Sequence, residues 1–115
     1  MSGIQRILVV DDESSLRSAL FRALNKKYQV ITASNATEAI GLAQGDLNLD
    51  LALIDLRLPD GNGIELMTQL RSSHPNMKTI ILTGHGTVEL AVEATKKGAS
   101  HFITCLLYTS DAADE

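Results

Sequence analysis

Acidic side chains directly follow two short apolar runs in this sequence. Asp11 and Asp12 come after residues 6–10, and Asp55 comes after the four apolar residues 51–54, while a third run ends at the hydroxyl of Thr83. Such runs are typical of parallel strands buried on both faces. Because ligand sites of open parallel sheets lie outside the carboxyl ends of the strands, we expect these four side chains to converge on one pocket.

Three carboxylates in one pocket favour metal-dependent phosphoryl chemistry. Their mutual repulsion raises their pKa values unless a cation lies among them. Oxygen ligands without histidine or cysteine suit Mg²⁺, which retains waters and accepts a phosphate oxygen. A carboxylate such as Asp55 can then attack phosphorus and form an aspartyl phosphate, while the Thr83 hydroxyl bonds the phosphoryl oxygens. The sequence therefore predicts a magnesium-assisted phosphoryl acceptor site.

Each of these signals also has a simpler interpretation when it is taken alone. Asp55 could merely end a strand, Asp11 and Asp12 could form a solvated turn, and Thr83 could cap the next helix. Only their combination at several strand ends favours a site.

Strand and helix patterns alternate along the whole chain. Strands are expected at residues 6–10, 28–33, 51–55, 79–83 and 101–104, with 28–33 at an edge of the sheet because its alternation is weaker. Helices are expected to begin at Ser14, after the caps Asn35 and Thr87, and at Ile64. This alternation predicts an α/β fold, a parallel sheet with helices on both faces, but does not set the strand order.

The spacing of apolar residues predicts which helix faces point inward. The first helix should bury Leu16, Ala19, Leu20, Ala23 and Leu24, and the fourth should bury Val88, Ala91, Val92 and Thr95.

Length and composition limit the class of protein. A chain of 115 residues, 44% apolar and 21% charged, is enough for one ordinary globular domain. Its net charge of −4 argues against nucleic-acid binding by this piece. No apolar run is long enough to span a bilayer, so we expect a cytoplasmic protein without membrane contact, which its single cysteine also fits.

Several motifs together resemble the receiver domain of two-component response regulators across residues 4–104. They are Asp11-Asp12, the block from Asp55-Leu-Arg to Gly63, Thr83-Gly84 and Lys97-Gly98-Ala99, in the order and spacing of that family. The resemblance implies a flavodoxin-like, doubly wound five-stranded parallel sheet with strand order 2-1-3-4-5.

The resemblance also assigns roles to individual residues. It implies that Asp55 accepts phosphate from the phosphohistidine of a sensor histidine kinase, and that Mg²⁺ is bound by Asp12, Asp55 and the backbone carbonyl of Arg57, with Asp11 holding metal waters. Thr83 and Phe102 would form the switch pair, Thr83 moving toward the phosphoryl group and Phe102 turning inward. The fourth helix and fifth strand would then signal to a homodimer partner or to an output domain, which the motif wording suggests binds DNA and regulates transcription.

The end of the chain departs from the family. Cys105-Leu106 stands where the family has Lys-Pro, and a thiol supplies no fixed positive charge to a phosphoryl group. Residues 105–115 resemble the translation of an adapter used in preparing sequencing libraries. We therefore expect a truncated receiver domain at residues 1–104, without its fifth helix and output domain, followed by a non-native tail at 105–115.

Two other functions stay open on the sequence alone. If the missing lysine is genuine, the chain is a receiver-like interaction module that acts without phosphorylation. A Mg²⁺-dependent phosphohydrolase is the weaker alternative, because Arg57 stands where its second catalytic acid would lie. On the favoured interpretation the protein is a phosphoacceptor switch with at most slow self-dephosphorylation rather than an enzyme in the usual sense.

Overall fold

The computed structural model describes residues 5–45, 48–84 and 86–104. Five strands form its main sheet, all of them parallel, and a short antiparallel hairpin lies beside it. The main strands are β1 (Arg6–Val10), β2 (Gln29–Ala33), β3 (Leu51–Asp55), β6 (Lys78–Thr83) and β7 (His101–Thr104). The hairpin strands are β4 (Arg57–Leu58) and β5 (Gly61–Asn62).

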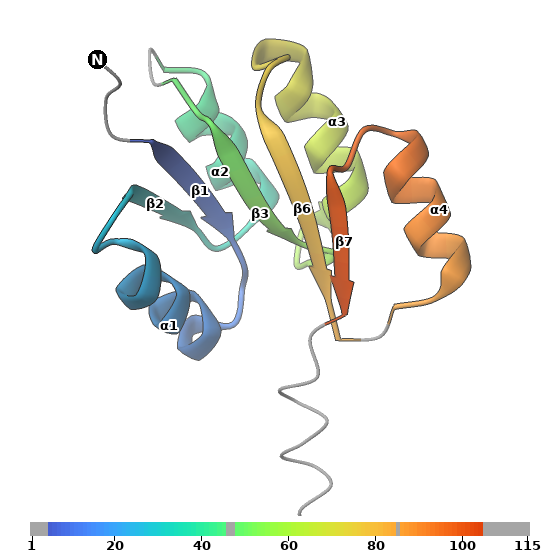
Figure 1. Cartoon of the computed structure of the whole chain (residues 1–115), viewed down its shortest axis with the longest axis horizontal. Helices are drawn as coiled ribbons and strands as arrows, with labels where there is room; N and C mark the ends of the chain where they lie inside the picture. The colour runs from blue at the N-terminus through green and yellow to red at the C-terminus, as the bar shows by residue number, and fades with distance from the viewer. Residues whose placement is uncertain (1–4, 46–47, 85, 105–115) are drawn as a thin grey trace, which may run out of the picture.

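The spatial order of the main strands is β2-β1-β3-β6-β7. When these five strands are numbered along the chain, this is the order 2-1-3-4-5, so the expected flavodoxin-like sheet is confirmed, with β2 at an edge. The chain direction across the sheet reverses at β1, which lies between β2 and β3 (Figure 1). This reversal opens a crevice at the carboxyl ends of β1 and β3, where ligands of such sheets bind.

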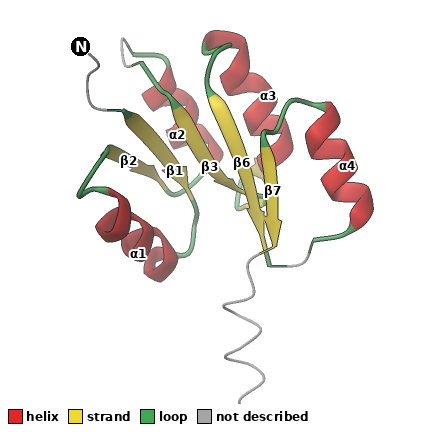
Figure 2. Cartoon of the chain, in the orientation of Figure 1, coloured by secondary structure: helices red, strands yellow, loops and turns green. Residues whose placement is uncertain are grey.

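Helices lie on both faces of the sheet, as the alternation predicts. They are α1 (Ser14–Leu24), α2 (Ala36–Ala43), α3 (Gly63–Ser73) and α4 (Val88–Lys96). In Figures 1 and 2, α1 lies on one face and α2 and α3 on the other, while α4 lies beside β7. The predicted caps are confirmed: Asn35 Oδ1 accepts from the Glu38 N–H at 2.7 Å, and Thr87 Oγ1 accepts from the Leu90 N–H at 3.1 Å.

The main core lies between the sheet and the α2–α3 face. Its fully buried side chains include Leu8, Ile54 and Ile81 from the strands and Met67 and Leu70 from α3. The opposite face is covered less well. There α1 buries none of its residues completely, and a groove of about 520 Å³ runs between Leu24 of α1 and Ile80 of β6.

Two expectations about helix faces are wrong. In α1, Ala19 and Ala23 are exposed although the spacing placed them inward, and only the leucines of the predicted stripe are partly covered. In α4, Val88 is 80% and Val92 47% exposed, Thr95 is exposed as well, and the buried residue is Ala94. The helix packs mainly on β7 at the edge of the sheet, so its contact face is narrow and excludes the two valines.

Within the described residues, no helix is both long and apolar enough to cross a membrane. The expectations about Cys105, the fifth helix and the non-native tail concern residues 105–115, which lie outside the described part of the chain.

Candidate functional site

The acidic residues meet at the carboxyl ends of two neighbouring strands. Asp11 follows β1 and Asp55 ends β3, and the pairing of Val10 with Ile54 places the two strand ends side by side. One carboxylate oxygen from each of Asp11, Asp12 and Asp55 lies within 4.8 Å of the others. The convergence of these three carboxylates, expected from the strand ends, is therefore what the fold produces.

Burial makes the Asp55 carboxylate more basic. The pKa of Asp55 is raised from 3.8 to about 6, first because burial removes water from the charged form and second because the Asp11 charge is close. Hydrogen bonds from the backbone N–H groups of Arg57 and Leu56 lower the pKa in part. The pKa of Asp11 is raised too, again chiefly by burial. Crowding was expected to raise these values; desolvation is the larger cause.

Asp11 is held in place through both its side chain and its backbone. Its Oδ1 accepts from the Glu13 N–H at 2.8 Å, and its carbonyl accepts from Arg17 Nη1 at 2.7 Å. The positive charge of Arg17 also lowers the pKa of Asp11 in part. The sequence pattern did not indicate this contact of Arg17, because helical spacing does not reveal a side chain that reaches back to the preceding loop.

The backbone after Asp55 turns tightly and is enclosed by the start of α3. The Gly63 N–H donates to the Leu56 carbonyl at 2.7 Å, and a Cβ on Gly63 would lie 2.3 Å from the Asp55 carbonyl oxygen. Arg57, the predicted source of a metal-binding carbonyl, lies two residues beyond Asp55 in β4 with its side chain exposed. Gly63 is thus a positioning residue for the strand end, and the sequence showed it only as the last residue of the motif that begins at Asp55.

Asp60 fixes the β4–β5 hairpin to the start of α2. Its carboxylate accepts from the N–H groups of Ala36 and Thr37 at 2.8 and 2.9 Å and from the Thr37 hydroxyl at 2.6 Å. These bonds, the hydroxyl first, lower the pKa of Asp60 to about 2. Asp60 belongs to the motif that follows Asp55. Its acidity and its position in a turn were the sequence signals that could have indicated this contact with α2.

Asp60→Ala is expected to destabilise the protein at neutral pH, because the N-terminus of α2 loses an anionic cap. Since the folded pKa lies below the ordinary value, the ionised group contributes stability above about pH 4, and this contribution is lost as the pH falls through about 2. Thermal unfolding at pH 7 and pH 3 measures it, with Asp60→Asn as the variant that keeps an acceptor. An Asp60→Ala deficit of equal size at both pH values contradicts the assignment.

Thr83 and Phe102 lie on the next two strands of the sheet, beyond the strand that ends at Asp55. Asp55 pairs with Leu82, so the buried Thr83 follows at the end of the neighbouring strand. Phe102 lies one strand further in β7, pairs with Ile81 and packs half-buried against the main core. The strand pairing places Thr83 at the same edge of the sheet as the acids, and its convergence with them on one pocket stays a prediction.

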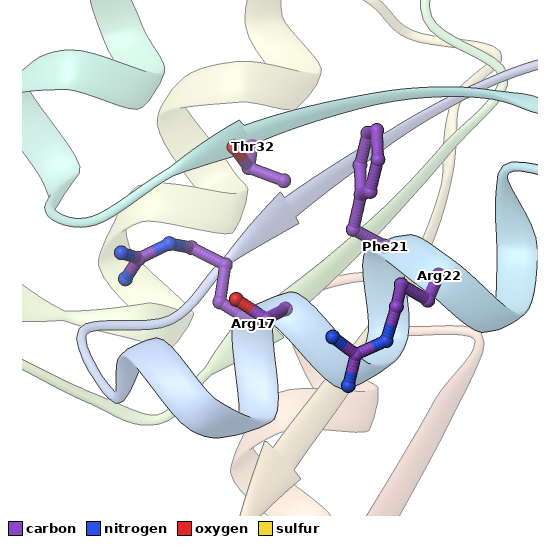
Figure 3. A pocket seen from close by; sticks show the side chains of 5 residues that line it. Arg17, Phe21, Arg22 and Thr32 are labelled. Atoms are coloured by element: carbon purple, nitrogen blue, oxygen red, sulfur yellow. The ribbon is translucent and has the colours of Figure 1, made fainter.

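A second pocket, of about 360 Å³, lies between α1 and β2 and is lined by Arg17, Phe21, Arg22 and Thr32 (Figure 3). The figure shows the two guanidinium groups pointing in different directions, so they do not form a clamp for one anion. The chemistry of the molecule is concentrated at the strand ends instead.

The carboxylate cluster suits a hard divalent cation. Its oxygen atoms lie close enough for some carboxylates to bind such an ion directly and others through water. It offers only carboxylate oxygens, the donor set that Mg²⁺ and Ca²⁺ prefer over softer metals. Positive charge here would also favour the ionised form of Asp55 and so lower its raised pKa.

The chain is similar to known regulatory proteins in sequence and in fold. Alginate biosynthesis transcriptional regulatory protein AlgB of Pseudomonas aeruginosa is 40% identical over 99 residues, which are 85% of this chain and 22% of that protein. The CheY-like receiver domain from Methanospirillum hungatei superposes with a TM-score of 0.85 at 30% identity, covering 97% of this chain and 90% of that one.

A response regulator protein from Burkholderia pseudomallei, solved with a phosphorylated aspartic acid, a calcium ion and citrate, superposes with a TM-score of 0.83 at 29% identity. It covers 95% of this chain and 64% of that one. Residues 7–106 match the sequence pattern of the response regulator receiver domain. On the sheet order, the strand-end carboxylates and this match, the chain belongs to the response regulator receiver domain family.

Proposed function

We propose that Asp55 is the phosphoacceptor of this receiver domain. The observation that carries the proposal is its position: it ends β3 beside β1, with the oxygens of Asp11 and Asp12 within 4.8 Å. A pKa of about 6 leaves Asp55 mostly ionised at neutral pH, as a nucleophile must be. The relative with a phosphorylated aspartic acid supports the same chemistry.

We further propose that Asp12, Asp55 and the Arg57 carbonyl bind Mg²⁺, with Asp11 holding its waters. When bound, the ion supplies positive charge that keeps these carboxylates ionised and neutralises the incoming phosphoryl oxygens. The donor set supports a divalent cation at this place, and a relative that was solved with a calcium ion supports the same class of metal.

In the proposed reaction, a carboxylate oxygen of Asp55 attacks the phosphorus of a phosphohistidine on a sensor kinase. The new O–P bond forms as the N–P bond breaks, and the imidazole leaves with the electron pair. The product is an acyl phosphate on Asp55, which water hydrolyses slowly. Hydrogen bonds from the Glu13 N–H and from Arg17 hold Asp11 in place, and Asp11 in turn helps to orient the site.

We assign the switch to Thr83 and Phe102. Thr83 ends β6, the strand next to the one that carries Asp55, and Phe102 lies in β7, the strand on which α4 packs. The outward side of α4 exposes Val88 and Val92, with a hollow of about 420 Å³ between them and Lys96. Exposed apolar groups of this kind mark interaction surfaces. They support a homodimer or output-domain contact through the fourth helix and fifth strand, the surface that the resemblance implies.

The chain spans 22% of the length of AlgB, whose name identifies it as a transcriptional regulator. We therefore propose that the whole protein carries a DNA-binding output domain. The receiver itself has a net negative charge and is not suited to bind DNA. We place the phosphotransfer in the cytoplasm, as the sequence predicts.

The clustered acids and the family favour this switch over a phosphorylation-independent module, and Arg57 in place of a second acid argues against a phosphohydrolase.

Incubation with acetyl phosphate and Mg²⁺, followed by intact-mass measurement, tests the proposal. We expect one phosphoryl adduct, lost in Asp55→Asn and retained in Asp50→Asn. The control residue lies beside the opposite end of β3, where its carboxylate accepts from the Arg6 N–H at 2.8 Å. A Cys105→Lys variant restores the family's lysine, and its failure to form any adduct would overturn the proposal.

A further inference from the structure

The loop between β6 and α4 packs closely on the predicted switch pair at one residue, Gly86. A Cβ atom placed on Gly86 would lie 2.5 Å from Thr104 Oγ1, 2.9 Å from Phe102 Cε1 and 3.3 Å from Thr83 Cγ2. The first two distances are shorter than carbon atoms tolerate, and the third is tight. A side chain at this one point of the loop would thus meet both Thr83 and the Phe102 ring.

Glycine is needed at this position for space rather than for backbone conformation. Among the described glycines only Gly98 has a positive φ, so alanine at position 86 introduces no backbone strain. The Thr104 side chain is exposed and can turn away, whereas the Phe102 ring is wedged against the main core. The unavoidable conflict of a larger residue is therefore with the ring.

We propose that Gly86 is a positioning residue of the switch, whose missing side chain gives the Phe102 ring room against the loop that follows Thr83. This inference rests on the switch assigned to these residues above. Movement of Thr83 toward a phosphoryl group carries Gly86 along, and the space beside the ring changes as a result. A methyl group at position 86 fills that space, so the ring is held away from the loop in both states.

Fluorine NMR can follow the ring directly, because the chain contains two phenylalanines, Phe21 and Phe102. Labelling with 4-fluorophenylalanine gives two signals, Phe102→Leu assigns them, and Phe21 on α1 serves as the internal reference. We expect Gly86→Ala to shift the Phe102 signal and leave the Phe21 signal in place. Acetyl phosphate with Mg²⁺ should move the Phe102 signal in the parent chain, and this movement should be lost in Gly86→Ala.

Gly61→Ala is the matched control, since Gly61 is also outside the helices, lacks a positive φ and offers a new Cβ only an ordinary contact of 3.9 Å with Ala36. It should leave both signals and their response unchanged. An unmoved Phe102 signal in Gly86→Ala, or an unchanged response to acetyl phosphate while the mass shows an adduct, overturns the inference.

A double-mutant cycle covers the case in which Gly86→Ala folds poorly. Phe102→Leu removes the Cε1 atom, so the loss of urea midpoint caused by Gly86→Ala should largely disappear in that background. An equal loss with and without the ring overturns the inference. The spectra without acetyl phosphate and the urea cycle need no phosphorylation, so a failure of Asp55 to form an adduct is recognised separately.

Discussion

Asp55→Asn is expected to stabilise the metal-free protein at neutral pH by about 1–2 kcal/mol. The carboxylate is half-buried beside Asp11, and its pKa is raised to about 6 because its charge is poorly solvated there. The amide has nearly the same shape and carries no charge. The full shift corresponds to about 3 kcal/mol, which we reduce for the solvent that still screens this group.

The pH dependence of stability provides the sharper measurement. A group whose folded pKa is raised contributes stability below its unfolded pKa, and that contribution is lost as the pH rises through the folded pKa. The parent should therefore lose stability relative to Asp55→Asn between about pH 4 and about pH 6. Urea unfolding in the presence of a chelator, repeated across this range, compares the two proteins.

Mg²⁺ should reverse the difference, because an ion bound among the carboxylates stabilises the parent more than the variant. Asp50→Asn serves as the control, since Asp50 lies outside the cluster and its carboxylate caps the Arg6 N–H. It should not stabilise the protein. A parent and Asp55→Asn with parallel pH profiles would show that the charge of Asp55 costs nothing in the folded state.

Gly63→Ala is expected to destabilise the protein by about 3 kcal/mol or more, at the upper end of the range for overpacked sites. The new Cβ would lie 2.3 Å from the Asp55 carbonyl oxygen and 3.0 Å from Leu56 Cα, both of them backbone atoms. Neither can turn aside as a side chain can. Relief requires the start of α3 to move away from the strand end, so any folded variant should also phosphorylate poorly at Asp55.

Gly41→Ala is the matched control for this experiment. Gly41 lies within α2, where a Cβ meets no atom within 4 Å, so the change should stabilise by about 0.5–1 kcal/mol through the helix preference of alanine. Urea midpoints measure both variants. If the two substitutions changed stability alike, the close approach of Gly63 to the Asp55 backbone could not be the cause.

Much of the fold could be predicted from the sequence because its signals are local. A buried strand reads as an apolar run, and a helix start reads as a capping residue, so β3 and the starts of α2 and α4 needed no distant contact to be recognised. The meeting of Asp11 with Asp55 followed from one general property of parallel sheets, that strand ends share an edge. Even so, the strand order came from resemblance and not from periodicity.

Features that depend on which surface covers which residue required the tertiary structure. Val88 and Val92 lie at helical spacing suited to a core, yet they are exposed, because α4 packs mainly on the edge strand of the sheet. The contact of Arg17 with the Asp11 carbonyl and the bonds of Asp60 to the start of α2 join segments that the sequence pattern treats separately.

The sequence by itself determined the elements, the acidic strand ends and the family motifs. The tertiary structure decided the environment of those residues: the burial that raises the pKa of Asp55, the backbone approach that requires Gly63, and the crowding at Gly86. The reason is physical. Propensity and capping act over a few neighbouring residues, whereas desolvation and steric exclusion depend on every atom that the fold brings within a few ångströms.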